Sequence, residues 1–222
     1  VLTTASQQDG TRGQIEKAVS THGKQRDLSL KQLPHVESAL EALRNGLGDM
    51  VALSAFDWRQ QDVSELMVAG VLPRKEPTWV LVGPDKPEYL PKNATLVCEH
   101  ELLRRQMLRL RADLDLISRD ELAVRCEEKA AYNDLDELDR WPWVEEKLMQ
   151  GHVAGFIVPR AVHNDARMKS RRHTPGLQRD PTEQEREQFI PPPLHGFTFL
   201  VTRPGFPFQP VATMTRPSAS LD

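Results

Sequence analysis

The chain has 222 residues, of which 39% are hydrophobic and 27% charged, and its formal net charge is -3. This length accommodates one large domain or two small ones, and the composition is typical of a folded protein rather than a disordered one. The slightly negative charge excludes a global electrostatic attraction to nucleic acid or to an anionic membrane. No apolar run approaches the roughly 20 residues needed to cross a bilayer, so we expect no transmembrane segment.

The first half of the chain predicts alternating strands and helices. Residues 1–5 predict a short strand, and a polar loop follows over residues 6–13. Apolar residues at helical spacing predict a helix over residues 35–46, ended by an Asn-Gly pair. Further buried strands are predicted at residues 49–56, 66–72 and 78–82. Three prolines within residues 83–92 indicate a hinge at which one lobe ends.

The second half continues the alternation. The predicted strands are residues 95–98, 114–117 and 152–158, and the predicted helices are residues 102–111, 119–132 and 144–150. The acidic and aromatic stretch 133–143 is interpreted as an insertion. Strands that alternate with helices favour an α/β architecture with mostly parallel sheets.

The composition changes from residue 168 onwards. Residues 168–188 are charged, with a basic cluster at 169–173, and one more strand is predicted over residues 196–202. The last segment, 203–222, contains four prolines and no periodicity, which predicts an extended tail. Because extended Pro-rich segments commonly lie along the surface of another protein, we expect this tail to contact a partner.

The two cysteines, Cys98 and Cys126, have neither Cys-x-x-Cys spacing nor the histidine partners of a zinc site, so no metal centre is expected. Reduced thiols are the favoured interpretation, and a disulfide between the two is the alternative. The first residue is Val1, which fits either a processed mature chain or a trimmed one.

Six segments carry short motifs that occur in the same order in one enzyme family. They are Val-Ser-Thr-His-Gly-Lys at 19–24, Gly-Asp-Met-Val-Ala-Leu-Ser-Ala-Phe-Asp at 48–57, Arg-Lys-Glu-Pro at 74–77, Leu-Arg-Arg-Gln-Met-Leu-Arg-Leu-Arg-Ala-Asp-Leu-Asp-Leu at 103–116, Arg-Asp-Glu-Leu-Ala-Val-Arg at 119–125 and Lys-Leu-Met-Gln-Gly-His-Val-Ala-Gly-Phe-Ile-Val at 147–158. On these segments the chain resembles the hydroxymethylbilane synthases, also called porphobilinogen deaminases. Each match is short, and their common order carries the resemblance.

The resemblance implies a two-lobed α/β fold like that of periplasmic binding proteins, equivalent to the first two domains of the family. The first lobe would span residues 1–92 and take back a return strand at about 194–202. The second lobe would span residues 93–188, followed by the Pro-rich tail at 203–222. The third domain of the family, which carries the cofactor cysteine, is missing.

The family couples pyrroles. An aspartate stabilises the cationic pyrrole that forms as ammonia leaves, and arginines hold the acetate and propionate groups of the substrate. By resemblance Asp57 would be the catalytic carboxylate, and the clamps for substrate carboxylates would be Arg104, Arg105, Arg119 and Arg125. Guanidinium groups suit this task because they hold carboxylates in bidentate pairs. Without the resemblance these charges would be interpreted as solvated helix faces or surface ion pairs.

Other positions depart from the family pattern. No cysteine follows residue 126, so the thiol that carries the dipyrromethane primer is missing and no cofactor is expected. The anion-binding Gly-Thr-Ser-Ser turn of the family is Glu-His-Glu-Leu at 99–102, and the Gly-Asn after the first clamp arginine is Asp-Glu at 120–121. Carboxylates at an anion site repel an anionic substrate. Phe56 replaces the lysine before the catalytic aspartate.

The N-terminal region is also short by comparison. If Arg12 in Gly-Thr-Arg-Gly at 10–13 is the first arginine of the family, only ten residues lie between that arginine and Gly23. This spacing predicts that the usual helix and strand are absent.

These departures favour a non-catalytic relative that serves as a structural or interaction subunit of a larger assembly, with other protein subunits as its partners. The alternative is a divergent hydroxymethylbilane synthase, or another pyrrole-binding enzyme of tetrapyrrole biosynthesis. A third reading is nucleic-acid binding by Arg104, Arg105, Arg109 and Arg111 on one helix together with the 169–173 cluster, against which the net charge weighs. An intracellular, mitochondrial location is expected on plausibility alone.

Overall fold

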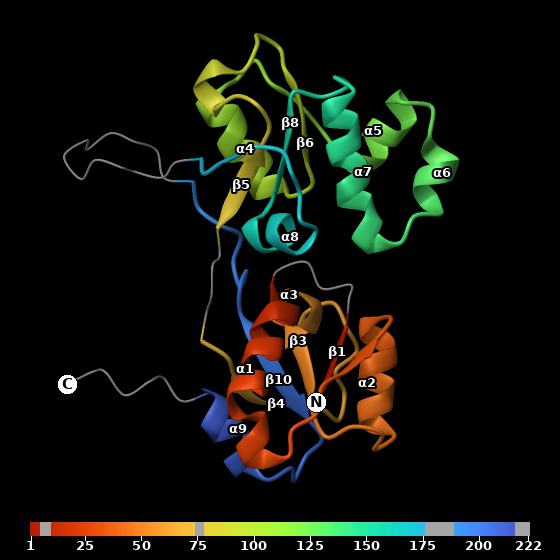
Figure 1. Cartoon of the computed structure of the whole chain (residues 1–222), viewed down its shortest axis with the longest axis vertical. Coiled ribbons are helices and arrows are strands. Elements are labelled where there is room, and N and C mark those ends of the chain that lie inside the picture. The colour runs from red at the N-terminus through yellow and green to blue at the C-terminus, as the bar shows by residue number, and fades with distance from the viewer. Residues whose placement is uncertain (5–9, 74–77, 176–188, 216–222) are drawn as a thin grey trace, which may run out of the picture. The chain divides into compact units, whose positions relative to one another are not determined.

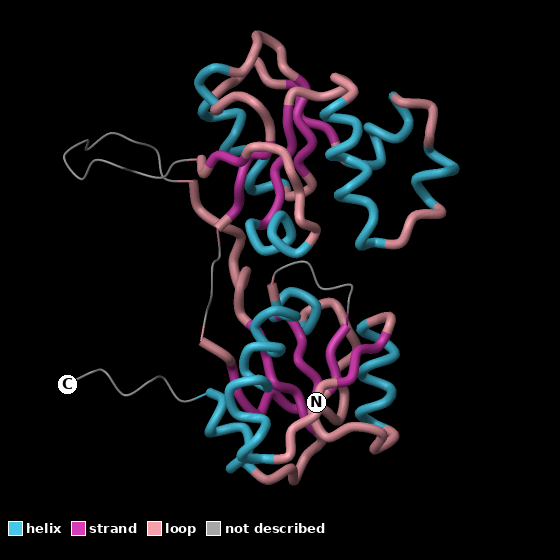
Figure 2. Tube along the Cα trace, viewed as in Figure 1, coloured by secondary structure: helices cyan, strands magenta, loops and turns pink. Residues whose placement is uncertain are grey.

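The computed structural model describes residues 1–4, 10–73, 78–175 and 189–215 (Figure 1). The chain forms two compact units. Unit 1 combines Val1–Pro77 with Leu194–Asp222, and unit 2 is Thr78–Pro193. In each unit a single sheet lies between helices (Figure 2).

Unit 1 is built on a five-stranded sheet of order β2-β1-β3-β10-β4. Its strands are β1 (Leu2–Thr4), β2 (Lys31–Leu33), β3 (Val51–Ser54), β4 (Met67–Val71) and β10 (Thr198–Thr202). Its helices are α1 (Thr11–Arg26), α2 (Val36–Arg44), α3 (Ala55–Trp58) and α9 (Phe208–Thr215). The return strand β10 is antiparallel to both of its neighbours, β3 and β4, whereas β2, β1 and β3 pair in parallel.

Side chains that alternate along the strands fill a hydrophobic layer on each face of this sheet. Val51 and Leu53 pack with the apolar stripe of α2, whereas Ala52 packs with Ile15 of α1 and Val211 of α9. This alternation is what a strand buried on both faces requires, since successive side chains point to opposite sides.

The prediction of an extended tail over residues 203–222 was wrong for residues 208–215, which form helix α9. Val211 and Met214 are buried in the layer between α1 and the sheet, so the segment folds onto its own unit. The close approach depends on Gly70 of β4, where an added Cβ would lie 2.5 Å from Cγ1 of Val211. The partner contact predicted for this segment therefore remains a prediction, and residues 216–222 lie outside the described residues.

Unit 2 repeats the same order in its own sheet, β7-β6-β8-β5-β9. Its strands are β5 (Trp79–Val82), β6 (Thr95–Cys98), β7 (Asp115–Ile117), β8 (Gly155–Pro159) and β9 (Arg172–His173). Its helices are the short 3-10 helix η1 (Pro87–Tyr89), α4 (Glu101–Leu110), α5 (Arg119–Arg125), α6 (Lys129–Asn133), α7 (Glu137–Met149) and α8 (Arg160–Asp165). Again the fourth strand in the order, β5, is antiparallel to both neighbours, and the others pair in parallel.

The repeated order confirms the two-lobed α/β architecture. The sheets are mixed rather than mostly parallel, because each described sheet has two parallel and two antiparallel strand pairs. The boundary differs from the predicted hinge, however, because the chain divides between Pro77 and Thr78 rather than at residue 92. The Pro-rich stretch 83–92 lies within unit 2. There the Arg111 guanidinium donates hydrogen bonds to the carbonyl oxygens of Pro87 and Leu90 at 3.2 and 3.1 Å, which holds this stretch against the end of α4.

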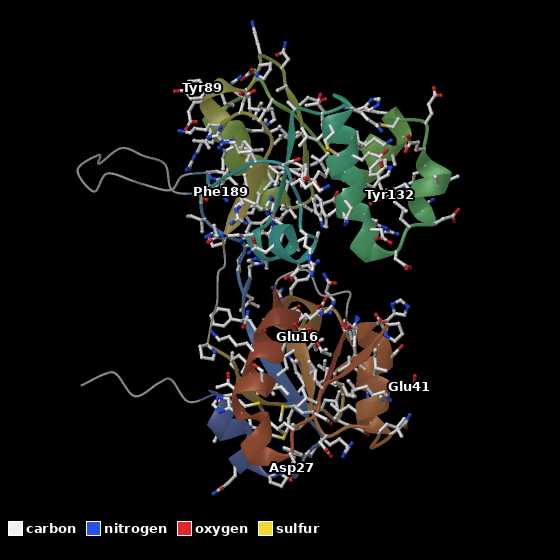
Figure 3. The ribbon with its side chains drawn as sticks, in the orientation of Figure 1. Glu16, Asp27, Glu41, Tyr89, Tyr132 and Phe189 are labelled. Carbon is white, nitrogen blue, oxygen red and sulfur yellow. The ribbon has the colours of Figure 1, made fainter. Side chains whose placement is uncertain are left out.

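Residues 119–143 also differ from prediction. The helix expected over 119–132 is two helices, α5 and α6, because Glu127 adopts a left-handed conformation with φ of 59°. The stretch interpreted as an insertion contributes to α7, and its aromatic side chains lie in the core. Tyr132 packs on Trp143 with ring centroids 4.9 Å apart, inside the group formed by α5, α6 and α7 (Figure 3).

The prediction that the N-terminal region lacks a helix and a strand was wrong as well. Helix α1 starts at Thr11 within the predicted loop and runs to Arg26, and strand β2 follows it. The helix and strand thought to be absent are therefore both present. Residues 19–24, whose motif resembles the family, lie inside α1. Within the described residues no helix is long and apolar enough to cross a bilayer.

Candidate functional site

Asp57 lies just beyond the carboxyl end of β3, in the first turn of α3. Ser54 is the N-cap of this helix, and its Oγ accepts a hydrogen bond from the Asp57 backbone N–H at 2.9 Å. The same hydroxyl donates to Oδ2 of Asp57 at 2.7 Å, which a serine can do because it is both donor and acceptor. The sequence Ser-Ala-Phe-Asp thus caps a helix and orients a carboxylate at once.

Burial raises the pKa of Asp57 above its ordinary value. The hydrogen bond from Ser54 opposes this change, and the charge of Glu37 adds to it. A carboxyl group that holds its proton more tightly than usual, at the carboxyl edge of a sheet, is a common feature of ligand and proton-transfer sites.

Buried polar side chains gather around the same edge of unit 1. Thr198, which pairs with Ser54 across β10 and β3, donates from its hydroxyl to that of Thr11 at 3.1 Å. The side-chain amide of Gln14 donates to the Gly196 carbonyl at 3.1 Å. Sequence reasoning missed this group because isolated threonines and glutamines carry no motif, and only the return of β10 brings them together.

Three buried side-chain oxygens of this unit are left without a hydrogen-bond partner among the described residues. They are Oγ1 of Thr3, Oε1 of Gln14 and Oγ1 of Thr202, whose residues are 1%, 9% and 0% exposed. Arg12, the arginine aligned with the family's first motif, points elsewhere and forms an exposed ion pair with Glu16 at 2.8 Å. Unit 1 therefore offers hydroxyls, one amide and one carboxylate, but Arg12 is not part of the group.

In unit 2 the best buried of the four predicted clamps is Arg119, at the start of α5. Its side chain is 13% exposed, and its Nε lies 3.4 Å from Oε1 of Glu99. The guanidinium also stacks over the Trp141 ring, 4.7 Å from the centroid. The same Glu99 oxygen accepts the Arg119 backbone N–H at 2.5 Å. Glu99 therefore neutralises this arginine within the unit.

The two clamps on α4 are also paired with carboxylates. Arg104 donates from Nε to the Cys98 carbonyl at 2.7 Å, and its Nη2 lies 3.4 Å from Oε2 of Glu121. Arg105 pairs with Glu101 one turn away at 2.8 Å, on the exposed side of the helix. Glu121 also completes a capping box with Ser118, and these hydrogen bonds lower its pKa.

Arg125 lies at the other end of α5 and pairs with Asp115 at 2.5 Å. Asp115 is the first residue of β7, whereas α5 begins just after the last residue of that strand. A helix of seven residues is about 10 Å long, so Arg125 is one helix length away from Arg119. Arg104, Arg105 and Arg119 therefore lie near the carboxyl ends of β6 and β7, with Arg105 on the exposed side of α4, whereas Arg125 lies away from them.

Every predicted clamp thus has a carboxylate partner in its own unit. Three of the four carboxylates, those of Glu99, Glu101 and Glu121, stand at the positions where the sequence departs from the family pattern. Asp57 belongs to unit 1 and the four arginines to unit 2, so neither unit contains the whole set.

Both cysteines are free thiols in the structure. Cys98 is fully buried at the end of β6, and this burial raises its pKa to about 12. Burial also raises the pKa of Cys126, which follows α5. A thiol that stays protonated is a poor nucleophile, so neither position favours the attachment of a group to sulfur.

No protein-family model and no curated protein sequence matches the chain. Among solved structures, the periplasmic substrate-binding protein of an ABC transporter from Coxiella burnetii aligns over 97% of this chain and 91% of its own, with 12% identity and a TM-score of 0.52. The methionine-binding protein MetQ aligns over 92% of this chain and 83% of its own, with 11% identity and a TM-score of 0.51.

At these identities the likeness shows the fold alone. The chain has the two-lobed, periplasmic-binding-protein-like fold. Neither of these structures is a hydroxymethylbilane synthase, so the finer resemblance stays a prediction, as does a mitochondrial location.

Proposed function

We propose that this chain is a non-catalytic protein of the hydroxymethylbilane synthase type that serves as an interaction subunit of a larger assembly. The observation that carries the proposal is the pairing of all four predicted clamp arginines with carboxylates of unit 2. A clamp that is already neutralised offers an incoming substrate carboxylate no net attraction.

Binding an anionic pyrrole here would require the substrate to displace internal carboxylates. At Arg119 it would displace Glu99 from a guanidinium that is largely shielded from water and stacked on Trp141. The displaced Glu99, with Glu101 nearby in sequence, would remain as negative charge at the site and repel the ligand. Both effects favour a protein that does not bind such a substrate.

The thiols support the same conclusion. The chemistry of the family needs a cysteine that carries a primer, and the thiols of Cys98 and Cys126 both have raised pKa values. A protein that has this fold but does not couple pyrroles would act through its surface, by binding other proteins.

The alternative is a divergent pyrrole-binding enzyme, and one observation favours it. Asp57 is held in place by Ser54, its pKa is raised, and buried hydroxyl and amide groups lie at the same edge of the sheet. These groups suit a small polar ligand that carries N–H donors, and they do not depend on the unit 2 arginines.

The first experiment is the native mass of the protein after gentle extraction from its source. Co-migration with other proteins far above its own 25.2 kDa is the expected result, and fractionation of the same extract tests the predicted compartment. Migration alone at about its own mass would contradict the interaction-subunit proposal.

Porphobilinogen tests the alternative directly. We expect no turnover by the purified chain, because no primer thiol is available. Turnover that Asp57→Ala abolishes, in a variant with an unchanged melting temperature, would establish the enzyme and exclude the non-catalytic proposal.

A further inference from the structure

We propose that the connection between α8 and β9 of unit 2 is a docking surface for the phosphate backbone of a nucleic acid. Residues 160–173 contain five lysine or arginine side chains and a single carboxylate, Asp165. In a chain whose net charge is -3, this is a local concentration of positive charge. The inference is independent of the function proposed above.

Three of these cations occur at every second position along the chain, and we refer to them as a row. Arg167, Lys169 and Arg171 are exposed, whereas Met168, between the first two, is buried in the core of unit 2 and is 8% exposed. Three exposed cations within five residues can contact neighbouring phosphates of one strand, which a single charged residue cannot do. We name this row the cationic loop.

The cationic loop is held in place by the body of the unit. The buried Glu145 carboxylate of α7 accepts the backbone N–H groups of Lys169 at 2.9 Å and Ser170 at 2.7 Å. The Arg171 carbonyl accepts the Gly83 N–H at 2.8 Å. Since these contacts hold the backbone, less conformational entropy is lost when a ligand binds than at a free segment.

None of the three cations forms an ion pair within the described part of the chain. The basic helix α4 differs, because its Arg104, Arg105 and Arg111 pair with Glu121, Glu101 and Asp113. The sequence suggested two basic segments for nucleic-acid binding, α4 and the 169–173 cluster. Among the described residues, the cations of the cationic loop are not neutralised by carboxylates, whereas these three arginines of α4 are.

Arg160, the first residue of α8, adds a further cation to the segment. Its Nε is buried and has no hydrogen-bond partner among the described residues.

Nucleic acid is the partner that this arrangement fits best. Repeated cations without paired carboxylates bind phosphate backbones by releasing counterions, with little dependence on base sequence. The row exposes three cationic side chains, and this favours a polyanion over an apolar peptide segment as the partner.

The test is fluorescence anisotropy with a labelled single-stranded RNA of about 20 nucleotides and a DNA of the same sequence. The variant replaces the row by Arg167→Gln, Lys169→Gln and Arg171→Gln. The matched control removes three exposed lysines elsewhere, by Lys17→Gln, Lys31→Gln and Lys92→Gln, and so changes the net charge equally.

We expect the row variant to bind RNA about tenfold or more weakly than the unmodified chain at 100 mM salt, and the control to bind within about twofold. The slope of log affinity against log salt should fall by about 2, as loss of three contacts to a single strand requires. Equal loss in both triple variants would overturn the proposal. Failure to bind either oligonucleotide at low salt, or binding only to anionic vesicles, would also overturn it.

Discussion

The Glu99 carboxylate contacts both the backbone and the side chain of Arg119. One carboxylate oxygen accepts the Arg119 N–H at 2.5 Å and lies 3.4 Å from Nε of the same residue. In the family that the chain resembles, a substrate carboxylate is the expected partner of such an arginine. Here the unit supplies that carboxylate itself.

Removing the charge of Glu99 should therefore open this position to an external anion. We expect Glu99→Gln to bind porphobilinogen or glutarate at least about fivefold more tightly than the unmodified chain, because a repulsive charge within a few ångströms of the anion is gone. Isothermal titration calorimetry measures the change. The control is Glu16→Gln, which removes a carboxylate paired with Arg12 in unit 1. Equal affinities in all three proteins would show that Arg119 is not an anion site.

Asp57→Asn should raise the melting temperature at pH 7. Burial raises the pKa of Asp57 in the folded state, so folding favours the protonated form. The stabilisation linked to this group is complete below its unfolded pKa of about 4 and is lost as the pH rises through the higher folded value. An asparagine keeps a neutral acceptor for Ser54 at every pH. We expect a gain of about 2 °C at pH 7 and none at pH 3, measured by differential scanning fluorimetry. A lower melting temperature at pH 7 would mean that the Ser54 hydrogen bond outweighs the cost of burial.

Gly70→Ala should loosen the packing of α9 on β4. The new Cβ would lie 2.5 Å from Cγ1 of Val211 and 2.6 Å from Cγ2 of Thr215, so these side chains or the helix that carries them must shift. We expect a loss of about 1–3 kcal/mol in the free energy of unfolding, as in other overpacked sites, measured by urea denaturation. The control is Gly13→Ala in α1, where nothing lies within 4 Å of the added methyl and a helical alanine stabilises by about 0.5–1 kcal/mol. Similar free energies for both variants would contradict the packing of α9 in this position.

Cys98 should resist alkylation in the folded protein. Its side chain is fully buried and its pKa is raised to about 12, so almost no thiolate exists at pH 8. In a Cys126→Ser variant, iodoacetamide should label the remaining thiol only after denaturation, as followed by mass spectrometry. Rapid labelling of the native protein would show that the end of β6 opens to solvent.

Much of the fold could be predicted because the signals are local. The strands predicted at 49–56, 78–82 and 95–98 are observed at 51–54, 79–82 and 95–98, and the spacing in α2 predicts its buried face. Local signals failed where burial against distant segments decides the conformation. α9 is an example, since Val211 and Met214 become helical against α1 and β4 rather than through any strong periodicity of their own.

The candidate site also combines contacts that are local in the sequence with contacts between distant residues. Asp57 and its helix cap follow from the sequence Ser-Ala-Phe-Asp, because the contact spans only three residues. Pairs such as Arg104 with Glu121 or Arg119 with Glu99 join residues that are 17 and 20 positions apart. The sequence shows that acids replaced neutral residues in the family pattern. Only the tertiary structure shows which arginine each acid neutralises, because ion pairing depends on distances of a few ångströms that the packing of helices on the sheet determines.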